Sequence, residues 1–402
     1  MSRSPQLLIV GAGPVGVVAA LAATQSGFDV QLIEAATEID TNPRAATTHP
    51  STLEMIHRIG LLDRFIAEGL VAREFQFWDR ESRARVATFD HDLLRDETPF
   101  PFVVQTEQHK LVRMGLEKLQ QYGMLARLGT RVIGCAQDAD RVSVQIESSA
   151  GQEAVSADWM IATDGGRSTI RKALGVPFEG YTWPERFVVL TVLDDVKALM
   201  GCCFRNYLAG VSEWANLFKV AGDDGKGRWR AVFPTRSDET DEEALSDVAV
   251  ATRLEGIYPL GHPYQLVHRN LYAVHQRVAE TFRIGRVLLA GDAAHVNNPI
   301  GGLGLNFGIH DAIDAVDSLS AVALQGEDDA VLDGYAHRRR SLNVKFVQDQ
   351  TVANKKRLEE KDLTVRQANL DGLRATAADP ARARAFLLRS SLIESVREAT
   401  RI

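Results

Sequence analysis

The first 34 residues show three successive patterns of apolar and polar positions. Residues 6–10 (QLLIV) form the short, continuous apolar run of a buried parallel-type strand. Residues 14–26 place small and branched apolar side chains at helical spacing, and Gly27 stands where a helix commonly ends. Residues 29–34 (DVQLIE) return to a strand pattern. The order strand, glycine turn, helix and strand predicts a βαβ unit of a parallel sheet.

The rest of the chain alternates between strand and helix patterns, without an internal repeat or a low-complexity linker. In chain order the pattern predicts an amphipathic helix over 51–65 with a Ser51/Glu54 capping box, a hairpin over 74–90, a helix from about Gln105 to Tyr122, an antiparallel meander over 131–163, a strand-rich region over 176–275, a buried parallel-type strand at 286–291, and helices after Gly304. This alternation predicts an α/β fold whose domains are interleaved along the chain.

Composition narrows the class of protein but does not define a function. The chain has 402 residues, 45% hydrophobic and 25% charged, as in ordinary soluble globular proteins. A net charge of -7 disfavours a nucleic-acid partner. No segment has the length of a membrane span, and the three cysteines have neither metal-ligand nor disulfide spacing. We therefore expect no metal, no membrane association and a cytoplasmic location.

The glycine turn after the first strand carries the first chemical motif. Gly11, Gly13 and Gly16 form a G-x-G-x-x-G that opens a helix, where free N–H groups favour a pyrophosphate. Glu34 ends the next strand, 18 residues after Gly16, and is placed to bind ribose hydroxyls. An acid at this position repels a 2′-phosphate, so the motif predicts bound FAD or NAD rather than NADP.

A second motif, GDAAHVNNPIGGLGLN, follows the strand at 286–291. Asp292 can accept a hydrogen bond from the ribityl chain of a flavin. The helix entrance at Gly302, Gly304, Leu305 and Asn306 can direct N–H groups at the negative charge of a reduced flavin ring. A third and less specific motif, DGGRSTIRKALG, begins at Asp164, and Ser168 can cap its helix.

With its three motifs in this order, the chain resembles the FAD-dependent aromatic hydroxylases, single-component flavoprotein monooxygenases with the p-hydroxybenzoate hydroxylase fold. The stretches DGGRSTIRKALGVPFEG and FRIGRVLLAGDAAH are most similar to 3-(3-hydroxyphenyl)propionate hydroxylases. The resemblance covers about residues 5–345, and residues 346–402 have no counterpart in it. Leu303 stands where phenol-type relatives often have Gln.

The resemblance implies a Rossmann-type FAD-binding domain interleaved with an antiparallel-sheet substrate domain, followed by C-terminal helices. The corresponding ranges are 1–70, 101–175 and 276–325 for FAD, 71–100 and 176–275 for the substrate, and 326–402 for the helices. It also implies a set of FAD-binding residues: Gly11, Gly13, Gly16, Glu34, Arg44, Gln105, Asp164, Asp292, Pro299, Gly302, Gly304, Leu305 and Asn306.

Substrate contacts and a general base are harder to predict. Aromatic and apolar positions in the strand-rich region, together with the second motif, suggest the following substrate residues: Tyr207, Trp214, Ala231, Phe233, Pro299 and Ile300. Among the histidines His49 is the best candidate for a base, but a structural role is favoured for it. His295 and His310 are expected to be structural.

The expected activity is hydroxylation of a phenol or hydroxylated heteroaromatic compound through a C4a-hydroperoxyflavin, with NADH or NADPH as transient co-substrate and O2 as oxidant. Two alternatives stay open. One is oxidation of a larger polycyclic or antibiotic substrate by the same chemistry, and the other is a flavin-binding protein without turnover. The sequence does not distinguish a monomer from a homodimer.

Overall fold

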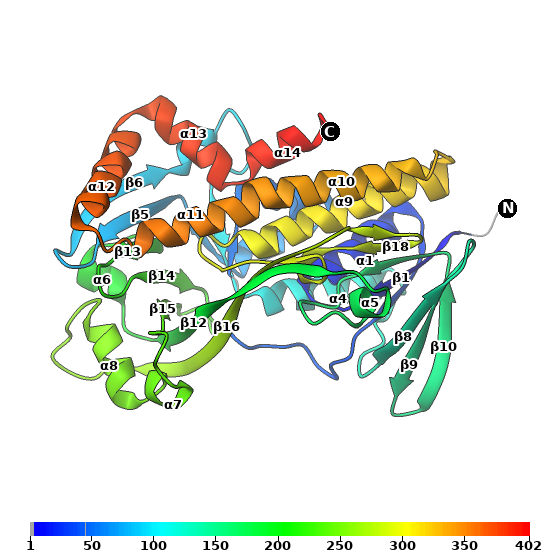
Figure 1. The fold of residues 1–402 in the computed structure, drawn as a ribbon, viewed down its shortest axis with the longest axis horizontal. Helices are drawn as coiled ribbons and strands as arrows, with labels where there is room; N and C mark the ends of the chain where they lie inside the picture. The colour runs from blue at the N-terminus through cyan, green and yellow to red at the C-terminus, as the bar shows by residue number, and fades with distance from the viewer. Residues whose placement is uncertain (1–3, 45) are drawn as a thin grey trace.

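The computed structural model describes residues 4–44 and 46–402, and in it a small parallel sheet and a large mixed sheet are joined by long helices (Figure 1). The parallel sheet has the order β17-β18-β11-β1-β2. Its four parallel strands come from distant parts of the chain: β1 (Gln6–Val10), β2 (Asp29–Ile33), β11 (Trp159–Ala162) and β18 (Val287–Leu289). The edge strand β17 (Arg283–Ile284) is antiparallel to β18.

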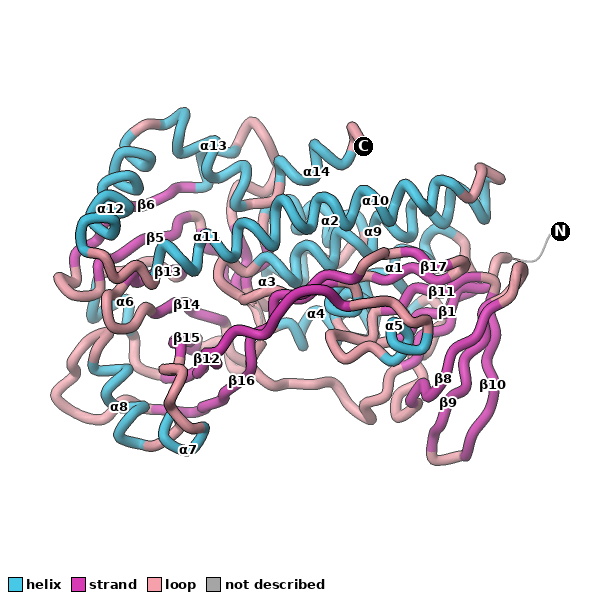
Figure 2. The backbone as a smooth tube through the Cα atoms, viewed as in Figure 1, coloured by secondary structure: helices cyan, strands magenta, loops and turns pink. Residues whose placement is uncertain are grey.

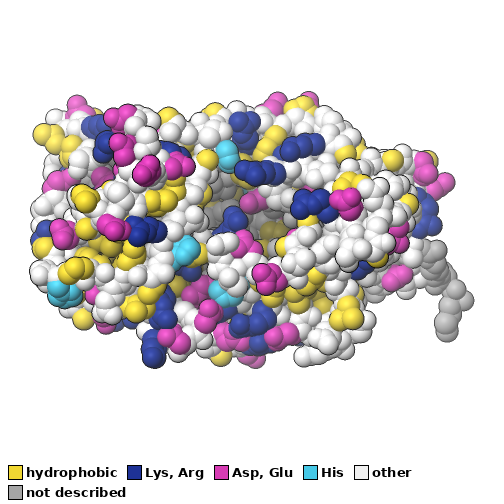
Figure 3. Space-filling view, turned by 90° about the horizontal axis from the view of Figure 1, so that it is seen from below, with side chains coloured by type: hydrophobic (Ala, Val, Ile, Leu, Met, Phe, Trp, Pro, Cys, Tyr) yellow, Lys and Arg dark blue, Asp and Glu magenta, His cyan; other side chains and the backbone are white. Residues whose placement is uncertain are grey.

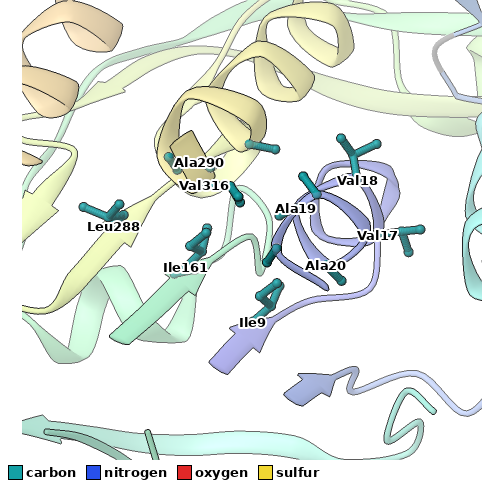
Figure 4. Close-up of a cluster of buried hydrophobic side chains, with 14 of the residues drawn as sticks. Ile9, Val17, Val18, Ala19, Ala20, Ile161, Leu288, Ala290 and Val316 are labelled. Atoms are coloured by element: carbon teal, nitrogen blue, oxygen red, sulfur yellow. The ribbon is translucent and has the colours of Figure 1, made fainter. Parts of the chain in front are cut away.

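Helices α1 (Pro14–Ser26) and α9 (Leu303–Gln325) pack on this sheet and on each other. Figure 4 shows Ile9, Ile161 and Leu288 from three neighbouring strands beside the small side chains of α1 and Val316 of α9. Four of the five residues of β1 are buried, as the uninterrupted apolar run predicts. At Gly308, a Cβ atom would lie only 2.8 Å from a methyl carbon of Val15, so glycine permits the close approach of the two helices.

The antiparallel meander predicted over 131–163 is confirmed over 131–157, but residues 159–162 form a parallel strand of the other sheet instead. The meander is an antiparallel sheet of β8 (Arg131–Gln137), β9 (Val142–Ser148) and β10 (Gly151–Ala157), after which the chain enters the parallel sheet as β11. Helix α4 (Gln108–Gln121) packs against α1. The short helix α5 (Thr169–Ala173) begins at Ser168, whose hydroxyl accepts a hydrogen bond from the Arg171 N–H, as predicted.

The large sheet has the order β19-β16-β12-β15-β14-β13-β5-β6. Its strands are β5 (Glu74–Asp79), β6 (Ala84–Asp90), β12 (Phe178–Val192), β13 (Arg205–Ala209), β14 (Ala215–Val220), β15 (Arg228–Pro234), β16 (Leu266–Ala279) and β19 (His295–Val296). Its outer face packs with α6 (Val196–Met200), α7 (Asp241–Ala244) and α8 (Asp247–Glu255) in one apolar cluster. A separate three-stranded sheet contains β3 (Thr47–Thr48), β7 (Val103–Gln105) and β4 (Leu70–Ala72).

The C-terminal region is helical and covers the inner face of the large sheet near β5 and β6 (Figure 2). Helix α10 (Ala330–Asn343) continues through a π-helical turn (Val344–Gln348) into α11 (Asp349–Leu358), which is followed by α12 (Leu363–Ala378), α13 (Pro380–Ser390) and α14 (Ile393–Ala399). The guanidinium group of Arg366 on α12 is bonded to Asp79 and Glu81 of the hairpin. No helix in the described part of the chain is both long enough and apolar enough to cross a membrane.

The structure also corrects one predicted helix. The helix expected over 51–65 is two helices, α2 (Pro50–Arg58) and α3 (Leu62–Ala67), because the chain turns at Gly60, which has a left-handed φ of 71°. The N-cap of α2 is His49, and its side chain accepts no capping bond. The predicted Ser51/Glu54 capping box is therefore wrong, and the Ser51 hydroxyl instead donates to the Ser391 carbonyl.

Candidate cofactor site and adjoining aromatic cavity

The predicted dinucleotide motifs meet at one edge of the parallel sheet. The glycine turn follows β1, Glu34 follows β2, Asp164 follows β11, and Asp292 lies just beyond β18. Because these strands run parallel, their carboxyl ends share an edge, which is where open α/β sheets bind ligands. The molecular surface also has a hollow on the face seen from below, with Lys, Arg and His side chains around it (Figure 3).

The three glycines of the first motif are needed for different reasons. At Gly11, φ is +103° and a Cβ atom would lie 2.5 Å from the Thr163 carbonyl oxygen. At Gly16, a Cβ atom would lie 1.8 Å from the Gly11 carbonyl oxygen. A Cβ atom at Gly13 would meet nothing within 4 Å, so protein packing does not require glycine there. The open space at Gly13, at the N-terminus of α1, fits a closely bound pyrophosphate.

Glu34 is fixed beside the glycine turn. Its carboxylate accepts hydrogen bonds from the Ala12 N–H at 2.7 Å and from the Ala36 N–H at 2.8 Å. The side chain is partly exposed, so a carboxylate oxygen can also accept from hydroxyl groups of a bound ribose.

Two further acids follow parallel strands but have different surroundings. Asp164 is half-buried and accepts from the Ser168 hydroxyl at 2.5 Å and from the Ile170 N–H at 3.1 Å, and burial raises its pKa. Asp292 lies in a short 3-10 turn (Gly291–Ala293) rather than at the strand end itself. Asp292 is exposed to solvent at the surface of the site. The protein atoms packed around it raise the pKa of its carboxyl group, and the opposite effects of His295 and Arg44 are smaller. Asp292 is thus an accessible acceptor in a crowded pocket.

The entrance to α9 is built from Gly301 and Gly302, which have φ values of 109° and 68°. Asn306 fixes this turn: its Nδ2 donates to the Thr47 carbonyl and its Oδ1 accepts from the His49 N–H, each at 2.8 Å. The His49 ring Nε2 lies 2.9 Å from the Gly301 carbonyl oxygen, to which it donates. His49 therefore positions the glycine turn, in agreement with the structural role favoured for it. Pro299, Gly302, Gly304 and Leu305 are only partly buried.

Gln105 supplies an independent indication of a bound group. It is fully buried at the end of β7, and its Oε1 accepts from the Thr47 hydroxyl at 2.8 Å. Its Nε2 has no partner among the described residues. A buried amide donor without an acceptor is costly, so this position fits a ligand that supplies one. Arg44, by contrast, is exposed and paired with Asp40 at 3.1 Å.

A cavity with an aromatic lining adjoins the Gly301 turn. It is lined by Phe75, Phe77, Arg205, Tyr207, Ile300, Gly301, Leu303, Gln350, Asn354, Arg357, Leu358, Phe386 and Ser390. The rings of Phe77 and Tyr207 stack at a centroid distance of 5.1 Å. Arg205 Nη2 donates to the Tyr207 hydroxyl at 2.6 Å and to the Gly301 carbonyl at 3.0 Å. The cavity therefore combines stacking surfaces with a polar group next to the glycine turn.

The cavity includes some of the predicted substrate residues. Tyr207 and Ile300 line it, and Pro299 immediately precedes Ile300. Trp214 is buried in the same apolar cluster as Tyr207 but packs on Phe187, at a centroid distance of 5.1 Å. Ala231 and Phe233 do not line it, because they lie in the cluster on the other face of the sheet, with α8. The alternation along β15 places these two side chains on one face but does not tell which face is inward.

Sequence reasoning missed most of the cavity. The alternation of Phe75 with Phe77, and of Arg205 with Tyr207, would have placed each pair on one strand face. Phe386 and Arg357 carry no comparable signal, because they belong to C-terminal helices that no motif assigns.

A buried network of charged and polar side chains, centred on Asp311, holds the second motif in place. Asp311 accepts from His295 Nε2 at 2.7 Å, from Arg339 Nε at 2.7 Å and from the Gly291 N–H at 3.1 Å. Burial raises the pKa of Asp311, but Arg339 and His295 outweigh it, so the pKa lies below its usual value. The ionised carboxylate therefore holds the turn that carries Asp292. His295 has the structural role expected for it.

Three further buried histidines are held neutral. Burial, aided by the positive charge of Arg205, lowers the pKa of His91 to about 3 and that of His49 well below 6.5. Burial and Arg339 lower the pKa of His310 to about 3. The His310 Nε2 lies 2.9 Å from the Thr52 hydroxyl, which gives His310 the structural role expected for it.

These histidines predict acid sensitivity of the fold. Between pH 6.5 and about 3 the unfolded chain binds protons at these histidines that the folded chain does not. The free energy of unfolding is therefore expected to fall as pH decreases, by about 1.4 kcal/mol per pH unit for each histidine. Urea unfolding across this range should give a shallower slope, by about that amount, for His91→Gln than for the wild-type protein. Equal slopes for wild type and His91→Gln would contradict the prediction.

Comparison with known proteins agrees with this geometry. A family model described as "FAD binding domain" matches residues 5–350. Para-nitrophenol 4-monooxygenase from Pseudomonas sp. (strain WBC-3) is 32% identical over 390 residues, which cover 95% of this chain and 94% of that enzyme. The 3-(3-hydroxy-phenyl)propionate/3-hydroxycinnamic acid hydroxylase of Escherichia coli O81 (strain ED1a) is 30% identical over 85% of this chain, but the match spans only 60% of that enzyme.

The crystal structure of p-nitrophenol 4-monooxygenase PnpA from Pseudomonas putida DLL-E4 superposes with a TM-score of 0.91 and 30% identity, and the match covers 98% of this chain and 99% of that one. It therefore includes the C-terminal helices that the motifs leave unassigned. The glycine turn, the Gln105 Nε2 without an acceptor among the described residues and the accessible Asp292 fit FAD. The chain belongs to the FAD-dependent aromatic hydroxylases and is a flavoprotein monooxygenase.

Proposed function

We propose that this enzyme uses NADH or NADPH and O2 to hydroxylate a small para-substituted phenol. The observation that carries the proposal is the aromatic cavity beside the Gly301 turn, with Arg205 and Tyr207 in its wall. Its wall combines the rings of Phe75, Phe77, Tyr207 and Phe386 with the hydrogen-bonded Arg205, which suits an aromatic ring that carries a polar group. The names of the similar nitrophenol monooxygenases support the same substrate class.

FAD, when bound, supplies the redox and oxygen chemistry of the reaction. The chain's own residues bind and orient. Gly13 and Glu34 would hold the nucleotide half of the cofactor, and Asn306 and His49 fix the glycine turn at the entrance of α9. Phe75, Phe77 and Phe386 exclude water from the aromatic substrate, which protects the reaction from side reactions.

The test is turnover by FAD-loaded enzyme under air. Oxidation of NADH and of NADPH is followed with 4-nitrophenol, other para-substituted phenols and hydroxypyridines, and the organic product is identified. The proposal predicts that a para-substituted phenol stimulates oxidation of one of the two nucleotides and is converted to an oxygenated product. If phenols fail and a polycyclic phenol is converted instead, the substrate proposal is wrong.

A further inference from the structure

Helix α11 contributes a polar wall to the aromatic cavity. Its residues Gln350, Asn354 and Arg357 line the cavity together with aromatic side chains of β5 and β13. Their spacing of four and three residues places the three side chains on one face of the helix. The match to the family model ends at residue 350, so Asn354 lies in a segment that this match does not reach. The cofactor motifs therefore do not account for this wall.

Hydrogen bonds within this wall fix the orientation of the Asn354 amide. Its Oδ1 accepts from Gln350 Nε2 at 3.0 Å and from Arg357 Nη1 at 3.4 Å. Both neighbours are donors at this position, because Gln350 Oε1 already accepts from Arg389 Nε at 3.1 Å and a guanidinium group has no acceptor. The reverse orientation of Asn354 would lose both bonds. Its oxygen therefore faces Gln350 and Arg357, and its NH2 group faces away from them.

The NH2 group of Asn354 lies beside the glycine turn. A Cβ atom at Gly301 would lie only 3.0 Å from Asn354 Nδ2. Nδ2 donates to the Ile300 carbonyl oxygen at 3.3 Å, and it has no second acceptor in the described part of the chain. An amide NH2 group has two N–H donors. One donor of Asn354 is therefore available to a group that lies in the cavity next to the turn.

We propose that Asn354 is a specificity-determining residue that donates a hydrogen bond to an oxygen atom carried by the aromatic substrate. The proposal rests on the proposed function and deepens it by naming a group on the ring that the enzyme recognises. Contact with the ring of Phe77 tolerates many substituents, whereas a fixed N–H donor favours a ring that carries an acceptor over an alkylated ring of similar shape. In a para-substituted phenol the acceptor is the hydroxyl oxygen or an oxygen of the para substituent.

The first test measures ligand binding to FAD-loaded wild type and Asn354→Leu without NADH or NADPH, so that no turnover occurs. Difference absorbance gives Kd for 4-nitrophenol, for 4-isopropylphenol, which lacks the nitro group, and for 4-nitrotoluene, which lacks the hydroxyl group. Asn354→Leu is expected to weaken binding of 4-nitrophenol about five- to tenfold. At least one of the other two ligands should be unaffected, and that ligand lacks the recognised oxygen. A similar loss for all three ligands, or no loss for 4-nitrophenol, would overturn the proposal.

The substitution Asn354→Asp tests the donor itself. It keeps the size of the side chain and an acceptor for Gln350, but an oxygen replaces the Nδ2 donor. Two acceptors then face each other, so 4-nitrophenol is expected to bind at least about tenfold more weakly than in the wild type. Binding of 4-nitrophenol by Asn354→Asp as tightly as by the wild type would contradict the donor role.

The matched control is Gln367→Leu on α12. The Gln367 amide is exposed and bonds to Asp371 at 3.0 Å, outside the cavity, so all three ligands should bind as they do to the wild type. Equal losses in Gln367→Leu and Asn354→Leu would contradict the assignment. Flavin content and the thermal midpoint establish that each variant is folded and loaded with FAD. Failure of the proposed function would differ, since phenols would not be turned over while Asn354→Leu still changed Kd selectively.

Discussion

Gly13→Val is expected to abolish tight FAD binding without unfolding the protein. The new side chain meets no protein atom in the position of its Cβ, so it projects into the space assigned to the pyrophosphate. We expect FAD affinity to fall at least about 100-fold, equivalent to roughly 3 kcal/mol. The thermal midpoint of the apoprotein should change little, because replacing Gly by Val at the N-cap costs only about 1 kcal/mol or less. Flavin content after desalting, together with the melting curve of the apoprotein, measures both effects.

Gly16→Ala is compared with Gly13→Val because it is expected to affect the stability of the apoprotein as well. There a Cβ atom collides with the Gly11 backbone, so the substitution should lower the stability of the apoprotein as well as flavin content. If Gly13→Val retained FAD with unchanged affinity, the cofactor would not approach α1 as inferred. If both variants behaved alike in stability, Gly13 would have a packing role that the structure does not reveal.

Arg339→Met should destabilise the protein by about 3–5 kcal/mol, because it leaves Asp311 charged and buried with one partner fewer. Asp311 binds the Gly291 N–H, so its displacement should also disturb the turn that carries Asp292. Urea unfolding of the FAD-free protein measures the stability, and FAD titration measures the effect on the site.

The exposed pair of Arg58 and Asp317 provides a matched control. Both of its side chains are about half exposed, so solvent screens the pair, and Arg58→Met is expected to cost less than about 1 kcal/mol. Similar losses for Arg58→Met and Arg339→Met would contradict the assigned importance of the buried network.

The sequence predicts the glycine turn and the parallel-sheet edge around it well because its signals are local. β1, the glycine turn and α1 are consecutive, and each is specified by spacing within a few residues. The approach of Asp164 and Asp292 to this edge follows from the parallel order of the strands that precede them. The parallel and antiparallel regions could likewise be predicted from continuous and alternating apolar patterns.

The aromatic cavity was less predictable because it depends on long-range packing. Alternation on β15 places Ala231 and Phe233 together, but only the packed helix α8 shows that their face is the outer one. Phe386 lies more than 300 residues from Phe75 in the sequence, yet the centroids of their rings are 6.2 Å apart. The break of the predicted helix at Gly60 is likewise not evident from the sequence, because the helical pattern continues past Gly60 whereas its backbone adopts a left-handed conformation.

We expect one FAD to be held by Gly13, Glu34 and Asp292 at the edge of the parallel sheet, together with Gln105 at the end of β7. The most direct measurement is a titration of the FAD-free wild-type protein with FAD, followed by flavin absorbance and by quenching of flavin fluorescence. We predict saturation at one FAD per chain and an increase in the thermal midpoint as FAD occupies the site. A folded protein that binds no FAD under these conditions would contradict the account.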